Sequence, residues 1–142
     1  MNMKGFTLIE ALVAVTILTL SIAGPLMVAN RAIVAAQMSR QQLTASYLAQ
    51  EGIEYVRAMR DDAYLAAYQA GNTSVAWNNF LSQCSGSACV PPLVADAFGN
   101  FTRSVEVVSV SSTDVRVTSL ASWSFHGAIH SVTIYDHLTP WQ

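Results

Sequence analysis

Charged residues are scarce in this chain: they make up 11% of it, against about 25% in an average soluble domain. The basic residues form no run, and they are Lys4, Arg31, Arg40, Arg57, Arg60, Arg103 and Arg116. Proteins that bind nucleic acids through the phosphates need clustered lysines and arginines. The sequence therefore does not favour nucleic acid as a partner.

Motifs that carry chemistry are also missing. The sequence has no glycine-rich phosphate loop, no nucleophile elbow and no zinc-protease motif. His126, His130 and His137 lie near one another, but no cysteine or carboxylate pair completes a metal site around them. Asp61 and Asp62 resemble a calcium ligand pair only loosely, and we interpret them as a solvated helix end. We expect no enzyme, no metal and no cofactor.

What the sequence has in abundance is apolar residues, at 52% of the chain. Residues 6–29 contain a single charge, Glu10. As a helix this run is about 36 Å long, enough to cross a hydrocarbon layer roughly 30 Å thick. The sequence therefore predicts a membrane segment. Lys4, which precedes the run, places the amino end in the cytoplasm and the remainder of the chain outside.

The start of the chain differs from an ordinary secretory signal, whose apolar region spans about 7–15 residues. Small residues do occur late in the run, at Ala23 and Gly24, but Pro25 follows them directly and would obstruct ordinary cleavage. A simple uncleaved anchor is the alternative interpretation. It gives the same topology and differs only in whether the first residues are retained.

The sequence GFTLIEALV at residues 5–13 resembles the N-terminal signature of type IV pilins and of the pseudopilins of type II secretion systems. In that family a membrane aspartic protease, the prepilin peptidase, cuts after the glycine and methylates the new amino terminus. The resemblance implies cleavage between Gly5 and Phe6, N-methylation of Phe6, and an assembly role for Glu10.

A carboxylate in a membrane segment costs about 2.5–3.5 kcal/mol at the centre on insertion scales and less near the interface. Cleavage would create a positive amine on Phe6, about 6 Å along the helix from Glu10. In a staggered filament the amine of one subunit would meet the Glu10 carboxylate of the next, so each buried charge has a partner. The alternative is that Glu10 lies among lipid headgroups, stabilised by the helix dipole.

We expect a helix break at Gly24 and Pro25, because proline removes a backbone hydrogen bond and clashes with the preceding turn. A gentle kink is the simpler interpretation. In the resembled family this part of the helix can unwind on assembly, which would correspond to residues 19–28 here.

From residue 30 the helix becomes amphipathic, with one apolar face made of Ala45, Leu48, Ala49, Gly52, Ile53, Val56 and Met59. The small residues of this face would let a sheet approach closely, and the helix is predicted over residues 7–68. The sequence LAQEGIEYVR at residues 48–57, with residues 60–62, resembles the corresponding region of minor pilins and minor pseudopilins.

Residues 69–100 lack a clean period and predict a long loop with a short helical turn at residues 75–81, pinned by Trp77, Phe80 and Leu81. Cys84 and Cys89 lie in this loop, in a serine-, glycine- and proline-rich stretch. A metal site would need further ligands, so beyond a membrane we expect a disulfide. Residues 101–111, 114–125 and 128–137 alternate like strands. The expected fold is α+β, with an antiparallel sheet on the helix.

These interpretations divide the chain into a leader at residues 1–5, a membrane or filament-core helix at 6–29, an amphipathic helix half at 30–68 and a head at 69–142. The resemblance implies a minor pilin or pseudopilin of a pilus, a type II secretion system or a DNA-uptake system. Its partners would be the prepilin peptidase, major and minor subunits, an inner-membrane assembly platform and the lipid bilayer. It would leave the cytoplasmic membrane for a surface or periplasmic filament. A membrane-tethered adhesin with a pilin-like anchor is the alternative.

Overall fold

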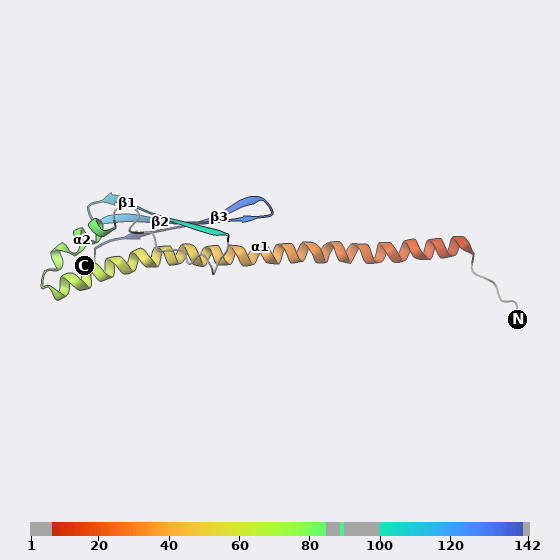
Figure 1. The fold of residues 1–142 in the computed structure, drawn as a ribbon, viewed down its shortest axis with the longest axis horizontal. Coiled ribbons are helices and arrows are strands. Elements are labelled where there is room, and N and C mark those ends of the chain that lie inside the picture. The colour runs from red at the N-terminus through yellow and green to blue at the C-terminus, as the bar shows by residue number, and fades with distance from the viewer. Residues whose placement is uncertain (1–6, 85–88, 90–99, 141–142) are drawn as a thin grey trace. The chain divides into compact units, whose positions relative to one another are not determined.

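The computed structural model describes residues 7–84, residue 89 and residues 100–140. The chain divides into two compact units, residues 1–39 and residues 40–142. The elements, labelled in Figure 1, are α1 (Leu8–Gln69), the 3₁₀ turn η1 (Thr73–Val75), α2 (Ala76–Gln83), β1 (Phe101–Ser111), β2 (Asp114–Phe125) and β3 (Ala128–Leu138).

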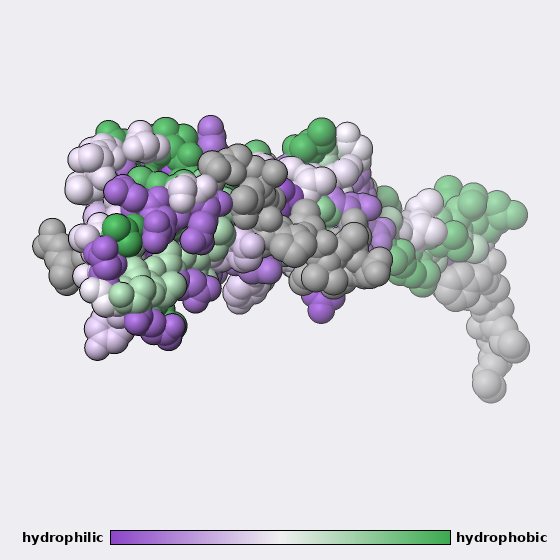
Figure 2. Space-filling view, turned by 60° about the vertical axis from the view of Figure 1, so that its left-hand side comes forward, coloured by the Kyte–Doolittle hydropathy of each residue, from purple (hydrophilic) through white to green (hydrophobic). Residues whose placement is uncertain are grey.

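The first unit consists of the N-terminal part of α1, and its side chains make almost no contact within the chain. Every side chain of residues 7–37 is exposed. The part of this helix that comes into view in Figure 2 is mostly hydrophobic, and Leu8, Ile9 and Leu20 are 81%, 71% and 74% exposed. By length and composition the helix is able to cross a membrane. Such a surface is stable only when lipid or another protein covers it.

Hydroxyl groups within this apolar helix are bonded to its own backbone. Thr16 Oγ1 donates to the Val13 carbonyl at 2.8 Å, Thr19 Oγ1 to the Thr16 carbonyl at 2.9 Å and Ser21 Oγ to the Leu18 carbonyl at 2.8 Å. A hydroxyl that bonds its own helix leaves no donor unsatisfied in hydrocarbon. These residues are therefore compatible with a lipid or filament-core environment.

In the second unit the sheet packs on the later part of α1. The strands form an antiparallel meander in the order β1-β2-β3. Alternate residues of β2 are buried, as a half-covered strand requires: they are Val115, Val117, Ser119, Ala121 and Trp123. The buried residues of α1 that belong to the predicted apolar face are Ala45, Leu48, Ala49, Gly52, Ile53 and Val56, with Met59 partly buried beside them.

Two arginines connect the sheet to the helix. The Arg103 side chain is completely buried, and its Nη1 donates to the Leu48 carbonyl at 3.1 Å and to Glu51 Oε2 at 2.9 Å. Arg57 Nη2 donates to Asp136 Oδ2 at 2.7 Å, and this hydrogen bond raises the pKa of Arg57. A buried guanidinium is costly without partners. These contacts therefore specify how β1 and β3 lie against α1.

Local sequence explains where the elements end. After α1, Gly71 has φ +74°, the Asn72 N–H bonds the Ala67 carbonyl and the Gly71 N–H bonds the Tyr68 carbonyl, both at 3.0 Å. This is a Schellman motif, which stops a helix at a left-handed glycine. Between β2 and β3, His126 and Gly127 have φ 51° and 80°. Positive φ at both residues is characteristic of a two-residue type I′ hairpin.

The segment between helix and sheet is anchored by α2. Trp77 and Phe80 are buried with ring centroids 5.3 Å apart, and Trp77 Nε1 donates to the Ser112 carbonyl at 2.9 Å. Cys84 and Cys89 form a disulfide with Cα atoms 5.1 Å apart, and both are buried in the core. The loop is thereby attached to the turn between β1 and β2.

The predicted α+β fold is confirmed. The helix predicted over residues 7–68 is found at Leu8–Gln69, and the first two strands have the expected bounds. The helical turn predicted at residues 75–81 is longer, because η1 and α2 together cover residues 73–83. Residues 85–88 and 90–99 of the predicted loop lie outside the described residues. The predicted domain boundaries stay a prediction, although the two units meet at residue 39 rather than residue 29.

Gly52 marks the closest approach of helix and sheet. A Cβ at this position would overlap Ser119 Oγ and would lie 3.0 Å from Val105 Cγ2 and 3.2 Å from Ser119 Cβ. Ser119 and Val105 are themselves buried, so neither side chain can move aside easily. Only glycine fits between α1 and the central strand.

We expect Gly52→Ala to destabilise the second unit, because overpacking costs about 1–3 kcal/mol and outweighs the roughly 1 kcal/mol that alanine gains over glycine in a helix. Gly24→Ala is the matched control, since nothing lies within 4 Å of a Cβ there. Circular dichroism of the full chain in detergent should show that the melting temperature of the sheet signal is lowered by roughly 5 °C for Gly52→Ala and is unchanged for Gly24→Ala. Equal melting temperatures of the two variants would contradict this close packing.

Candidate functional site

The start of α1 is capped by a side chain. The Glu10 N–H lies 3.1 Å from the Thr7 carbonyl and 3.4 Å from Thr7 Oγ1, and the Ala11 N–H lies 3.2 Å from the Thr7 carbonyl. Thr7 is therefore the N-cap residue, and its hydroxyl is a second acceptor for the Glu10 N–H beside the Thr7 carbonyl. An ordered helix start holds Glu10 at a definite place in the first turn.

Thr7 and Glu10 have the spacing of a capping box, in which threonine at the N-cap is followed by glutamate at the third helical position. Sequence reasoning singled out Glu10 but missed Thr7. The signal was present in the Thr-x-x-Glu pattern just before the apolar run. Glu10 thus lies where the positive end of the helix dipole favours a carboxylate.

Glu10 is surrounded along the helix by exposed apolar side chains. Leu12 and Val13 are 58% and 51% exposed, and Leu8 and Ile9 more so. None of the described residues forms an ion pair with Glu10. A carboxylate on an otherwise apolar surface needs an external partner once that surface is covered. Within the described residues, the apolar helix therefore begins with a negative charge that has no ion pair.

The two residues of the predicted cleavage site, Gly5 and Phe6, lie outside the described residues. Their roles in cleavage and methylation stay predictions. The first turn of α1 follows directly after them, so Thr7 would be the second residue of the cleaved chain.

Gly24 and Pro25, the predicted helix break, both lie inside α1, which is helical on either side of them. Proline has no N–H, so the Ser21 carbonyl lacks its usual helical donor. Gly24 adds a residue of low helix propensity next to that gap. In this state the helix is continuous. Unwinding on assembly concerns another state and stays a prediction.

The three histidines considered for metal binding are separated by the fold. The His130 ring stacks on Trp123 with centroids 5.6 Å apart, and the His126 ring lies 4.3 Å from that of Phe125. His137 Nδ1 lies 3.0 Å from the carboxylate oxygens of Asp114. No three metal-ligating side chains come together anywhere in the described part of the chain. Asp61 bonds to Arg60 instead of forming a ligand pair with Asp62.

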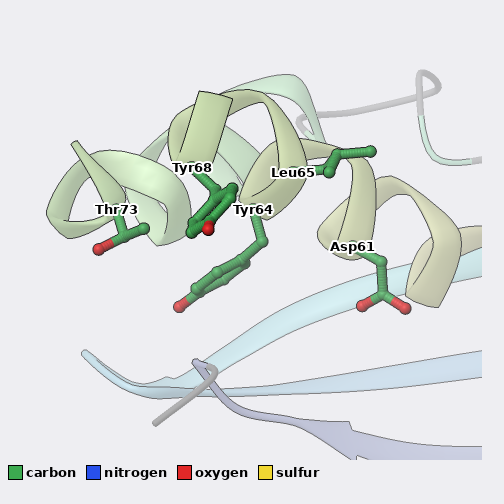
Figure 3. Close-up of a pocket in the computed structure, with 5 residues that line it drawn as sticks. All are labelled: Asp61, Tyr64, Leu65, Tyr68 and Thr73. Carbon is green, nitrogen blue, oxygen red and sulfur yellow. The ribbon is translucent and has the colours of Figure 1, made fainter. Parts of the chain in front are cut away.

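A shallow pocket of about 330 Å³ lies at the end of α1. Figure 3 shows Tyr64 and Tyr68 near each other with Leu65 to one side of them, and Tyr68 is 73% exposed. The described residues that line the pocket include no base and nucleophile pair, and we assign no chemistry to them. Its lining residues are Asp61, Tyr64, Leu65, Tyr68 and Thr73.

Comparison with known protein families gives one match. The family model described as the prokaryotic N-terminal methylation motif matches residues 1–24. The matched segment contains Gly5, Phe6, Thr7 and Glu10 and ends just before Pro25. No curated protein and no solved structure matches the chain significantly. The match therefore concerns the beginning of the chain and leaves the second unit unassigned.

We expect Thr7→Val to loosen the first turn of α1, because removal of an N-cap hydroxyl costs about 1 kcal/mol. Amide hydrogen exchange of residues 8–11 in detergent micelles should become about fivefold faster. Thr19→Val is the matched control, because its hydroxyl bonds a carbonyl and caps nothing. Unchanged protection in Thr7→Val would show that Thr7 does not hold the helix start.

Proposed function

We propose that this chain is a structural subunit of a type IV pilus-like or type II secretion filament, because it carries the N-terminal methylation motif that marks the type IV pilin and pseudopilin family. The motif indicates a substrate of the prepilin peptidase. Cleavage between Gly5 and Phe6 releases the leader, and Phe6 becomes the N-methylated first residue. The subunit is structural rather than catalytic.

The observation that carries this proposal is the fully exposed apolar surface of α1 over residues 7–37. Each leucine or isoleucine side chain taken out of water contributes about 1.5–3 kcal/mol. Lipid covers this surface before assembly. The apolar helices of neighbouring subunits replace the lipid in a filament, and van der Waals packing between these helices, rather than transfer from water, supplies most of the adhesion between subunits.

Glu10 sets the register between subunits. Cleavage produces an amine at Phe6, about 6 Å along the helix axis from Glu10. When helices stack with a stagger, the amine of the incoming subunit reaches the Glu10 carboxylate of its neighbour. Both charges lose water as the apolar surfaces meet, so only a pairing geometry avoids a desolvation penalty of several kcal/mol per ion.

The second unit lies on the side of the membrane opposite to Lys4. The Cys84–Cys89 disulfide supports this topology, since such bonds persist in oxidising compartments and are rare in the cytosol. The subunit starts as a single-pass protein of the cytoplasmic membrane and moves into a surface or periplasmic filament through an inner-membrane assembly platform. The Gly24-Pro25 step provides the weak point at which residues 19–28 unwind during that transfer.

We assign the chain to the minor subunits, which prime a filament or occupy its tip together with other minor and major subunits. The support is the resemblance of residues 48–57 and 60–62 to minor pilins and pseudopilins. In this structure that segment is where the sheet meets the helix. Gly52 supplies the close approach, and Glu51 and Arg57 bond to β1 and β3.

We expect Gly5→Val to block processing, because a branched side chain fills the space that the peptidase needs at the cleavage site. Mass spectrometry of the protein from its native host should show the wild type without residues 1–5 and with one added methyl group, and the variant intact. A wild-type mass that includes Met1 would identify an uncleaved anchor and overturn the proposal.

We expect Glu10→Ala to be cleaved normally but to enter filaments at least tenfold less often, because it leaves the partner amine buried without a counter-charge. The ratio of filament-bound to membrane-bound subunit in sheared cells measures this. Glu106→Ala is the control, since Glu106 is an exposed carboxylate on β1. Wild-type incorporation of Glu10→Ala would exclude the charge pair.

A further inference from the structure

The face of the sheet that points away from α1 carries a small pocket of mixed polarity. It lies over the strands β2 and β3 and has a volume of about 360 Å³. Among the described residues, the pocket is lined by two cross-strand pairs, Arg116 with His137 and Thr118 with Tyr135. Directly opposite residues on one face of a sheet lie about 5 Å apart, so these side chains converge on one spot.

Arg116 is the fixed cation of this pocket. It is exposed, and it makes no ion pair with any residue of the described ranges. Arg57, Arg60 and Arg103, by contrast, are all paired to carboxylates. A guanidinium is planar and presents a fork of donors that matches a carboxylate in two parallel hydrogen bonds. Arg116 is thus available for the carboxylate of a ligand, although Asp114 and Glu106 lie near it on the same face of the sheet.

His137 is held in a defined orientation beside the arginine. Its Nδ1 lies 3.0 Å from both carboxylate oxygens of Asp114, and about half of its side chain is exposed. An imidazole held through Nδ1 leaves Nε2 to form a hydrogen bond with a ligand. The pocket therefore offers a second polar nitrogen next to its cation, and the nearby Asp114 charge disfavours a highly charged anion such as phosphate.

The surroundings of the pocket favour a sugar over a peptide. Tyr135 is 70% exposed and supplies an aromatic face, and the hydroxyls of Thr133, Ser131 and Ser122 continue from it along the same face of the sheet. The backbone of β2 is paired on both sides, so a peptide lying on the face of the sheet would find main-chain partners only at the outer edge of β3. Side-chain hydroxyls match the hydroxyl groups of a saccharide chain instead.

The geometry points to a binding site for an acidic saccharide of the uronic-acid type on the outer face of the sheet. The sugar carboxylate bonds the Arg116 guanidinium, a ring hydroxyl forms a hydrogen bond with His137 Nε2, and the ring packs on Tyr135. The neighbouring sugar units lie along the hydroxyl groups of β2 and β3. Binding of this kind is a property of the second unit and does not depend on filament assembly.

Calorimetric titration of the full chain in detergent micelles tests this site, with digalacturonate as the probe. We expect digalacturonate to bind, and a neutral digalactoside at the same concentration to give no signal. Arg116→Gln should weaken the affinity at least tenfold, because it removes the charge-assisted pair. Arg40→Gln is the matched control, with the same change of charge at an exposed position of α1.

A second pair of variants tests the aromatic contact. Tyr135→Phe should retain most of the affinity and Tyr135→Ala should lose it, while the melting temperature of both stays close to that of the wild type. Two results would overturn the inference: equal weakening by Arg116→Gln and Arg40→Gln, or binding of a tetra-aspartate peptide as tight as that of digalacturonate. Either result would mean that the protein attracts anions in general and has no specific site for the saccharide at Arg116. The processing of residues 1–5 would be unaffected in all cases.

Discussion

An apolar helix surface that carries one unpaired carboxylate cannot remain in water, and the rest of this protein follows from that constraint. Residues 7–37 bury nothing within the chain. The hydroxyls of Thr16, Thr19 and Ser21 bond to the backbone of the same helix, whereas the Glu10 carboxylate has no ion pair with any described residue. Hydrocarbon covers the apolar surface but cannot neutralise the charge. In the proposed filament a neighbouring subunit with a free amine would do both, so anchoring and assembly would share one helix.

The later part of α1 solves a different problem, because there the helix must support a sheet. Ala45, Ala49 and Gly52 have small side chains or none, so β2 can approach the helix closely there. Ser119 fills the space next to Gly52. Arg103 and Arg57 then bond across to Glu51 and Asp136. Apolar packing brings the sheet and helix together, and the directional bonds of the guanidinium groups specify how they are arranged. The outer face of the sheet remains free to contact other molecules.

Much of the fold was predictable, and the reasons are local. The bounds of α1 follow from an apolar run, an amphipathic stripe and Gly71, since each acts within one or two helical turns. The hairpins follow from alternating residues and two-residue turns. The helix α2 was underestimated, because its eight residues contain too few turns for a clear period and their order depends on the burial of Trp77 and Phe80. Thr7 was overlooked although its spacing to Glu10 is a known capping pattern.

The sequence by itself determined the elements, the membrane-compatible helix and the place of its single charge, because these depend on neighbours along the chain. The tertiary structure alone decided which polar groups meet. Arg103 reaches the Leu48 carbonyl across 55 positions, and Arg116 and His137 become neighbours only through the register of β2 and β3. Pairing between distant segments depends on sheet register and on the distance between helix and strand. A local sequence pattern predicts neither quantity. A shift of one residue in the strand register would move every side chain of that strand to the opposite face of the sheet.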